Sequence, residues 1–505
     1  MPASLPSRGP LLEPQCGTGA GTAPQRPGPL RIPAFGILAG NNVHLHIMGI
    51  CGTFMGGVAQ LGLAAGHRVT GCDAAVYPPM SDQLRAAGVD VIEGYGADQI
   101  DLRPDLFLVG NVVSRGNPLF EAVLSSGARF TSGPAWVGEQ VLHGRHVVAV
   151  AGTHGKTTTA AMVAWILQCA GVDPGFLIGG VPLDLGKTAH LGTGRAFVIE
   201  ADEYDSALFD KRSKFVHYFP STLLLNNLEF DHADIFPDLA AIETQFHHLL
   251  RCVPGRGRVI VNGRDAALRR VLERGVWSEV QWFDADEDWH WRASSDGTDA
   301  FSIWRGARRL GDLVQAPAGD HNRSNALAAI AAAAHVGVEV PQSLEALRRF
   351  AGVRRRLELR GTVQGVNLYD DFAHHPTAIA ATLAGLRRRV GAARILALLE
   401  PRSNTMRMGA MQDLIAGSLG EADLVFCYGP RSGPHTLGWD PRDALRALGA
   451  KARVFDQLED LVAAVAASAR RGDQVVTMSN GSFGGVHDKI LAALRGSASD
   501  VGVPV

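Results

Sequence analysis

Cysteine is scarce in this chain, and long uninterrupted apolar runs are missing. The six cysteines among 505 residues are scattered and form no C-x-x-C pair. This pattern fits neither a zinc site nor a disulfide framework, and it favours reduced thiols in the cytoplasm. Because no stretch of about eighteen apolar residues is free of charge, the sequence predicts no membrane span. We therefore expect a cytoplasmic protein that has no membrane partner.

An excess of either charge is also missing. The chain has 48 lysines and arginines against 50 acidic residues, so nucleic acid is not an expected partner and soluble partners are favoured. Residues 1–42 are rich in proline and glycine. They lack the charged start and the apolar core of a signal peptide, so we expect a disordered tail. At about 150 residues per domain, the rest of the chain predicts three domains.

The most informative stretch is 147–160, VVAVAGTHGKTTTA, which predicts a buried strand, a phosphate-binding loop and the start of a helix over about residues 158–169. Gly152 and Gly155 allow a tight turn that points backbone N–H groups at phosphate oxygens. Lys156 is placed to contact the β and γ phosphates, and Thr157 to hold Mg²⁺. The first glycine of the strict pattern G-x-x-x-x-G-K-[ST] is replaced by valine. A glycine turn with an incidental lysine is therefore the alternative.

A second glycine-rich turn lies nearer the start. A strand-like run from Val43 leads through this turn and a helix-like stretch to a strand that ends at Asp73, which is a β-α-β pattern. Cys51 stands where the fingerprint G-x-G-x-x-G needs its second glycine, and this disfavours NAD. Asp73 is placed to accept hydrogen bonds from a sugar, although a turn cap explains it equally well. The segment predicts a site for a nucleotide diphosphate.

Two acidic segments follow apolar runs in the middle of the chain. Residues 197–199 lead into EADEYD, and residues 221–225 lead into NNLEFDHADIF. Side chains at the carboxyl ends of strands face the ligand crevice of an open α/β sheet, so Glu200 and His232 are candidate metal ligands beside Thr157. Histidine is an unusual ligand for Mg²⁺. A capped loop histidine is the alternative interpretation of His232.

Asn322 and Asn325 are three residues apart near the start of an alanine-rich helix, hence on one face of it. Their amides suit an adenine edge or a ribose, and capping of the helix by Asn322 is the alternative.

In the basic cluster 354–356, an arginine suits the charge of a phosphoryl transition state, whereas a solvated linker is the other interpretation. A hairpin signal at 296–297 predicts a small antiparallel layer packed by the tryptophans of this region, Trp277, Trp282, Trp289, Trp291 and Trp304.

Six motifs together point to one family: AGTHGKTTTA, EADEYD, DHADIF, HNRSNALAA, RRRLELRG and YDDFAHHPTA. In this order they resemble the Mur ligases, the ATP-dependent enzymes that form amide bonds in bacterial peptidoglycan synthesis. The resemblance covers about residues 43 to 495. It implies an α/β fold with an N-terminal Rossmann-like UDP-binding domain (43–145), a central P-loop-type ATPase domain (146–352), a C-terminal Rossmann-like peptide-binding domain (353–496) and a tail (497–505).

The resemblance also implies a role for each matching residue. The catalytic group comprises Lys156, His232 and Arg356. The implied ligands of Mg²⁺ are Thr157, Glu200 and His232. The implied ATP-binding residues are Gly152, Thr153, His154, Gly155, Lys156, Thr157, Thr158, Asn322, Asn325, Arg356 and Asp371. The UDP-sugar is assigned to Gly49, Cys51, Gly52, Thr53, Asp73 and His375, and the peptide to Arg402, Ser403, Asn404 and Thr405.

Within the family, the segments GICGTFMGG, FDKRSKFVHY, LEPRSNTMRMG and MSNGSFGG resemble ligases that join UDP-N-acetylmuramate to the recycled tripeptide L-alanyl-γ-D-glutamyl-meso-diaminopimelate. This implies ATP and Mg²⁺ as cofactors, an acyl phosphate intermediate, small-molecule and peptide substrates, and a monomer. Some family members hold a second Mg²⁺ with a carbamylated lysine. Residues 228–250 contain no lysine, and His247 or a neighbour stands in its place, so we expect no carbamylation.

Three alternatives stay open. The first is the sibling ligase that adds free L-alanine to UDP-N-acetylmuramate. The second is a folylpolyglutamate-type ligase, which shares the ATP-binding fold but needs no complete UDP-binding domain. The third is a nucleotide-sensing protein with a dead site, and the intact Lys156, Glu200, His232 and Arg356 argue against it.

Overall fold

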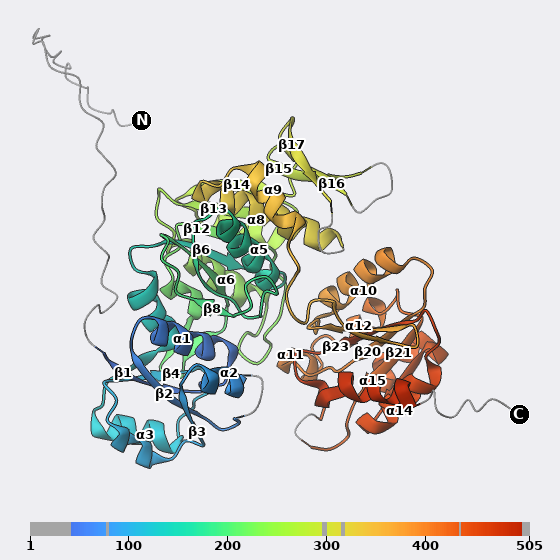
Figure 1. Ribbon diagram of the computed structural model, residues 1–505, viewed down its shortest axis with the longest axis horizontal. Helices are drawn as coiled ribbons and strands as arrows, with labels where there is room; N and C mark the ends of the chain where they lie inside the picture. Colours follow the sequence, from blue (N-terminus) through green and yellow to red (C-terminus); the bar gives the residue numbers. More distant parts are fainter. Residues whose placement is uncertain (1–41, 77–79, 295–299, 315–318, 434–435, 497–505) are drawn as a thin grey trace, which may run out of the picture. The chain divides into compact units, whose positions relative to one another are not determined.

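The computed structural model describes residues 42–76, 80–294, 300–314, 319–433 and 436–496, and these residues belong to one compact unit. Three large sheets and a two-stranded sheet are built from them, and Figure 1 colours the chain from blue to red. The predicted hairpin signal at 296–297 and nearly all of the predicted N-terminal tail lie outside the described residues. Within the described ranges, no helix is both long and apolar enough to cross a membrane.

The first sheet is parallel and has the strand order β3-β2-β1-β4-β5. Every residue of β1 is buried, as expected for a central strand that is covered on both faces. The strand order reverses at β1, so a ligand crevice is expected at the carboxyl ends of β1 and β4. The elements are β1 His44–Met48, α1 Thr53–Ala64, β2 Arg68–Asp73, α2 Met80–Ala86, β3 Asp90–Glu93, β4 Leu106–Val109, α3 Pro118–Ser126, β5 Phe130–Ser132 and α4 Gly133–Trp136.

The second sheet has ten strands in the order β17-β16-β15-β14-β13-β12-β6-β9-β7-β8. β6 lies between β12 and β9, and both neighbours run parallel to it. The loops after these three strands therefore start at one edge of the sheet. The strands are β6 His146–Ala151, β7 Gly175–Leu177, β8 Ala189–His190, β9 Ala196–Ala201, β12 Thr222–Leu225, β13 Arg258–Asn262, β14 Glu279–Phe283, β15 Trp289–Ala293, β16 Phe301–Arg305 and β17 Arg308–Leu313.

The predicted antiparallel tryptophan layer is confirmed in part. Trp289 and Trp291 lie on β15, and Trp304 lies on the antiparallel strand β16. Trp282 lies instead on β14, which pairs in parallel with β13. Trp277 precedes β14 and is exposed, so the prediction is wrong for these two residues. A separate hairpin is formed by β10 Asp205–Ala207 and β11 Asp210–Ser213.

Two buried helices lie behind the predicted phosphate loop. α5 (Lys156–Cys169) begins at Lys156, two residues earlier than predicted, and packs against α8 (Asp320–Val336). The N-cap of α8 is Gly319, so Asn322 does not cap this helix. Small alanines let α8 sit deep in the core. The other helices of this part are α6 Leu239–Leu250, α7 Ala266–Glu273 and α9 Val340–Arg348.

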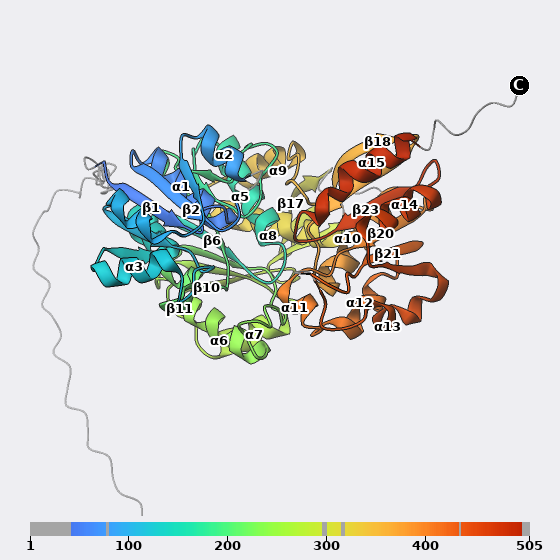
Figure 2. The same cartoon turned by 90° about the horizontal axis from the view of Figure 1, so that it is seen from below.

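The third sheet has the order β18-β19-β23-β20-β21-β22 and is parallel except for β18. One core beside it contains residues of α10 and α12, and another contains residues of α14 and α15; Figure 2 shows α14 next to α15. The elements are β18 Glu358–Val363, β19 Val366–Asp371, α10 Pro376–Val390, β20 Ile395–Leu399, α11 Asn404–Arg407, α12 Gln412–Ser418, β21 Leu424–Tyr428, α13 Pro441–Ala444, β22 Ala452–Phe455, α14 Leu458–Ser468, β23 Gln474–Met478 and α15 Val486–Gly496.

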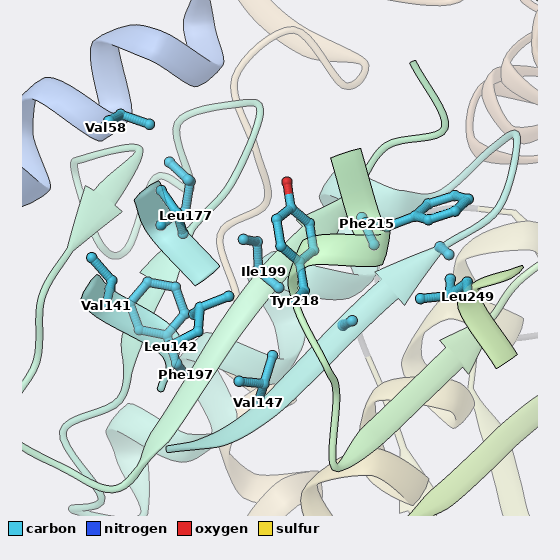
Figure 3. Close-up of a cluster of buried hydrophobic side chains, with 14 of the residues drawn as sticks. Val58, Val141, Leu142, Val147, Leu177, Phe197, Ile199, Phe215, Tyr218 and Leu249 are labelled. Carbon is cyan, nitrogen blue, oxygen red and sulfur yellow. The ribbon is translucent and has the colours of Figure 1, made fainter. Parts of the chain in front are cut away.

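One continuous apolar core joins the first sheet to the second. Figure 3 shows Val58 of α1 close to Leu177 of β7, with Ile199 and Tyr218 further along the same cluster. A side chain at Gly57 would collide with Leu177, so this helix approaches the strand as closely as it does because residue 57 is glycine.

Candidate active site

A single cavity of about 2240 Å³ collects nearly all the predicted site residues. Residues from all three large sheets and their loops line it. Of the residues predicted to bind metal, ATP, UDP-sugar or peptide, only Gly152 and His375 do not line this cavity. Its volume exceeds the roughly 300–1,000 Å³ of an ordinary small-molecule pocket, and it is therefore large enough for more than one ligand.

The phosphate loop begins where β6 ends. The valine that replaces the first expected glycine is Val150, which is buried in β6 and pairs with Glu200 of β9, so the loop proper starts only at Gly152. Gly152 and Gly155 have φ values of 139° and 79°, which favour glycine. Asn227 accepts a hydrogen bond of 2.7 Å from the backbone N–H of His154 through its side chain. The loop is thus held in shape by the segment after β12.

Lys156 is paired with carboxylates that the sequence analysis did not single out. Its Nζ donates to Glu203 Oε2 at 2.8 Å and lies 3.6 Å from Asp202 Oδ1. Although burial alone lowers the pKa of Lys156, the charges of Glu203 and Asp202 outweigh it and raise this pKa. Asp202 also accepts from Lys214 at 3.0 Å. Lys156 therefore lies between two carboxylates, and one of these, Asp202, lies between two lysines.

Thr157, Glu200 and Arg356 meet next to the lysine. Thr157 Oγ1 donates to Glu200 Oε1 at 2.9 Å, and Arg356 Nη2 donates to Thr157 Oγ1 at 3.3 Å. The backbone N–H of Gly179 donates to the other oxygen of Glu200 at 2.7 Å, which orients the carboxylate. A hydroxyl beside a carboxylate is a ligand pair that suits Mg²⁺.

His232 contacts Glu203 rather than Thr157 or Glu200. Its Nε2 lies 2.9 Å from Glu203 Oε1, and its backbone has a φ of 55°, an uncommon left-handed conformation for histidine. Burial alone lowers the pKa of His232, but the hydrogen bond with Glu203 and the charges of Glu203 and Asp231 raise it above its ordinary value. Of the three predicted metal ligands, Thr157 and Glu200 thus contact each other, whereas His232 contacts Glu203, which was not predicted.

The predicted adenosine pair lies against the phosphate loop. Asn325 accepts from Thr159 Oγ1 at 3.1 Å and donates to Asn322 at 3.2 Å. A side chain at Gly155 would meet Asn325 at 2.6 Å, so this asparagine supports the loop directly. Asn322 lines the cavity and is half-buried.

The basic cluster is not a solvated linker. Arg355 donates to the carbonyl oxygens of Ser479 and Gly481 at 2.7 and 2.6 Å. Asp371 accepts the backbone N–H of Leu357 at 2.7 Å and so fixes the turn that follows Arg356. Burial raises the pKa of Asp371 above its ordinary value. The loop that carries Arg356 is therefore anchored on both sides.

Three of the four predicted peptide residues bind the chain itself. Ser403 caps α11 by accepting a hydrogen bond from the backbone N–H of Met406. Asn404 donates to Asp234 at 2.8 Å, and Thr405 Oγ1 donates to Asp231 Oδ1 at 2.6 Å. Arg402 lines the cavity. Its guanidinium makes no hydrogen bond with a described residue and packs where a side chain at Gly481 would lie.

The first sheet contributes the loop after β1. Asp73 accepts the backbone N–H of Cys51 through Oδ2 at 2.9 Å, so it holds the glycine-rich turn in place. His375 does not join this group. It is the N-cap of α10, its Nε2 contacts the carbonyl oxygen of Phe230 at 3.3 Å, and its ring centroid lies 4.6 Å from that of His154.

Sequence reasoning missed Asp202, Glu203 and Lys214. Asp202 and Glu203 belong to the motif EADEYD but follow the end of β9. Side chains alternate between the two faces only within a strand, so the sequence does not predict which way these two point. Lys214 lies beside Asp202 with its Nζ 5.5 Å from the ring centroid of Phe54. His247, in contrast, lies on α6 against Trp277 and does not line the cavity.

Three family models match the chain: "Mur ligase family, catalytic domain" over residues 44–145, "Mur ligase middle domain" over 150–333 and "Mur ligase, glutamate ligase domain" over 355–481.

Relatives match over nearly their whole length. The chain is 52% identical over 459 residues to UDP-N-acetylmuramate–L-alanyl-γ-D-glutamyl-meso-2,6-diaminoheptandioate ligase of Escherichia coli, covering 90% of this chain and 99% of the relative. The crystal structure of a murein peptide ligase from Psychrobacter arcticus is 44% identical, with a TM-score of 0.71 over 92% of this chain and 100% of that chain. A UDP-N-acetylmuramate–L-alanine ligase of Roseiflexus castenholzii is 34% identical, over 91% of this chain and 98% of the relative.

Proposed function

The chain belongs to the Mur ligase family, and we propose that it joins UDP-N-acetylmuramate to the tripeptide L-alanyl-γ-D-glutamyl-meso-diaminopimelate at the expense of ATP. The observation that carries the proposal is the difference in identity between two kinds of relative. Identity is 52% to a ligase named for this tripeptide and 34% to a ligase named for L-alanine, with similar coverage. This difference supports the tripeptide as the amine donor and peptidoglycan recycling as the context.

A carboxylate is a poor electrophile, so the lactyl carboxylate of the sugar first takes the γ-phosphoryl group of ATP and becomes an acyl phosphate. Lys156, at the N-terminus of α5, would neutralise charge on the phosphates, and Arg356 would stabilise charge on the transferred group. The L-alanine amine of the tripeptide then attacks the acyl carbon, and phosphate leaves as the amide forms. The 3.3 Å contact between Arg356 and Thr157 supports this arrangement.

Mg²⁺ is the proposed metal cofactor. Thr157 and Glu200 fit it, because a hydroxyl and an oriented carboxylate lie 2.9 Å apart. His232 remains the proposed third ligand, and it would exchange its present contact with Glu203 for the ion. When bound, Mg²⁺ neutralises charge on the ATP phosphates.

The remaining assignments stay proposals of the same kind. Asn322, Asn325 and Asp371 belong to the ATP side, the turn from Gly49 to Thr53 with Asp73 to the UDP side, and Arg402 to the distal carboxylate of diaminopimelate. We retain the predicted domain boundaries after residues 42, 145, 352 and 496, the monomer and the cytoplasmic location as predictions. The proposed base that deprotonates the amine is a carboxylate near His232, or His232 itself if it does not hold the ion.

The proposal is tested by ATP hydrolysis in the presence of UDP-N-acetylmuramate and a panel of amines. We expect the tripeptide to stimulate phosphate release and to be incorporated into the nucleotide sugar, as measured by mass spectrometry. Free L-alanine, L-glutamate and water serve as controls. Stimulation by free L-alanine alone would identify the sibling activity instead, and no stimulation by any amine would support a nucleotide-sensing role.

A further inference from the structure

A second group of metal-type ligands lies beside the phosphate loop, and the proposed chemistry does not use it as a group. We propose that His154, Glu229 and His375 form a binding site for a borderline divalent cation such as Zn²⁺, distinct from the Mg²⁺ site. One ligand atom from each residue lies within 4.8 Å of the other two. His154 comes from the phosphate loop, Glu229 from the loop after β12 and His375 from the start of α10.

The distances within this group fit a tetrahedral ion. His154 Nε2 lies 3.4 Å from Glu229 Oε2, and His375 Nδ1 lies 3.5 Å from the same oxygen. With Zn²⁺ to nitrogen or oxygen bonds of about 2.1 Å, the edge of a ligand tetrahedron is about 3.4 Å. Two of the three edges therefore have the required length, and the third, between the two histidines, is at most 4.8 Å.

The hydrogen bonds of His375 determine which ring nitrogen is free to bind a cation. Its Nε2 contacts the carbonyl oxygen of Phe230 at 3.3 Å, and a carbonyl oxygen can only accept, so Nε2 carries the proton. Its Nδ1 accepts weakly from the backbone N–H of Thr377 at 3.3 Å. Nδ1 therefore carries a lone pair 3.5 Å from Glu229 Oε2, and a cation that binds there replaces the weak contact with Thr377.

Neighbouring groups orient the ligands as in known metal sites, where ligating histidines and carboxylates are themselves hydrogen-bonded. Phe230 holds the ring of His375, and Thr377 Oγ1 donates to Glu229 Oε2 at 2.6 Å. Burial alone raises the pKa of Glu229, but hydrogen bonds from His154 and Thr377 lower it to about 2. Burial also lowers the pKa of His375. Glu229 and His375 are therefore in the protonation state that a metal needs, and His154 Nε2, which donates to Glu229, would exchange its proton for the ion.

The donor set selects the class of cation. Two imidazoles and one carboxylate suit Zn²⁺ and its first-row neighbours, whereas Mg²⁺ prefers oxygen ligands. Because the ligands come from the phosphate loop and from α10, a bound ion would tie these two elements together. Its binding should therefore raise the temperature of thermal unfolding.

The test uses the full-length, chelator-treated protein without ATP, in excess Mg²⁺, titrated with Zn²⁺ in a calorimeter and with Co²⁺ by visible absorption. We expect one Zn²⁺ per chain and a Co²⁺ spectrum typical of tetrahedral nitrogen and oxygen ligands. Glu229→Gln should weaken Zn²⁺ binding at least about tenfold and abolish the rise in unfolding temperature. The matched control Asp202→Asn, in the neighbouring cluster of Asp202, Glu203 and His232, should keep both.

Thr377→Val provides a second variant that removes only a hydroxyl, in case Glu229→Gln does not fold. We expect it to weaken Zn²⁺ binding about tenfold by releasing Glu229. The proposal is overturned if the wild-type protein binds no Zn²⁺ in excess Mg²⁺. It is also overturned if Zn²⁺ affinity survives Glu229→Gln, or if Asp202→Asn rather than Glu229→Gln removes it.

Discussion

Lys156 Nζ donates a 2.8 Å hydrogen bond to Glu203 Oε2, and Glu203 is 2% exposed. The lysine of the phosphate loop is thus already neutralised by a buried carboxylate before any nucleotide arrives. Phosphate oxygens have to compete with Glu203 for this lysine. The pair therefore links nucleotide affinity to the stability of the free protein.

Glu203→Gln should separate these two effects. Loss of the negative charge leaves the buried Lys156 without its hydrogen-bonded carboxylate, with Asp202 at 3.6 Å as its remaining ion-pair partner, and we expect the free energy of unfolding without nucleotide to fall by about 3 kcal/mol. The Kd for ATP should fall severalfold, because the competitor is gone. Thermal unfolding with and without ATP measures both. Asp205→Asn, whose exposed partner is Lys211, is the control, and an unchanged ATP affinity in Glu203→Gln would contradict the competition.

Arg356→Ala should lower kcat by about 10³-fold with a small change in the KM for ATP. The expectation follows from the position of its guanidinium beside Thr157 and from the effect of arginines on phosphoryl transition states. Steady-state kinetics with all three substrates provides the measurement. Arg349→Ala removes an exposed arginine that pairs with Glu345 and should leave kcat unchanged. A fall of less than tenfold in Arg356→Ala would show that the arginine is not at the transferred group.

Arg402→Ala should raise the KM for the tripeptide much more than the KM for ATP, because a guanidinium suits the distal carboxylate of diaminopimelate. Thr405→Val should behave differently. Thr405 donates a hydrogen bond to Asp231, which also accepts the backbone N–H of His232 at 2.7 Å. Loss of the Thr405 hydroxyl should therefore lower kcat with little effect on either KM. If both constants are unchanged in Arg402→Ala, this arginine does not bind the peptide.

The stability of the first sheet should fall in mild acid because of His46. This fully buried histidine bonds Thr70 and Gln99, and burial lowers its pKa from 6.5 to about 4. Below pH 6.5 the unfolded chain takes up a proton that the folded chain refuses until about pH 4. Stability is therefore lost as pH falls through this window, by about 2 kcal/mol between pH 7 and pH 5 at about 1.4 kcal/mol per pKa unit.

Urea unfolding at several pH values checks this expectation. His46→Gln should flatten the dependence between pH 4 and 6.5. His143→Gln, at an exposed histidine, is the matched control and should keep the slope of the wild type. Equal slopes in the wild type and in His46→Gln would contradict the assignment.

The sequence predicts strands well because they are buried runs with clear ends. The apolar runs at 395–399 and 474–478 predict strands of the last domain, and β20 and β23 have these same bounds. The contact between Thr157 and Glu200 also follows from the sequence. Glu200 lies at the carboxyl end of one parallel strand, and Thr157 follows the loop that leaves the carboxyl end of the neighbouring strand. These are local properties or properties of a regular sheet.

Contacts between loops were not predictable in the same way. The pairing of Lys156 with Glu203, and of Thr405 with Asp231, depends on the path of loops. Loops have no regular alternation of apolar and polar residues from which their path could be predicted. His375 is a similar case, because its neighbours His154 and Glu229 are more than 140 residues away in sequence. His375 caps α10, and the position of this helix places His375 next to His154 and Glu229. No pattern in the sequence predicts where the start of α10 lies relative to these two residues.

The continuous core of Figure 3 limits how this protein can be dissected. A fragment cut after residue 145 would leave Val58, Val137 and Val141 facing water, and its counterpart would expose Leu177 and Phe197. Such fragments are expected to aggregate rather than report the binding properties of their parts. The third sheet has two cores largely of its own, so expression of residues 353–496 alone is the more promising truncation for studying peptide binding in isolation.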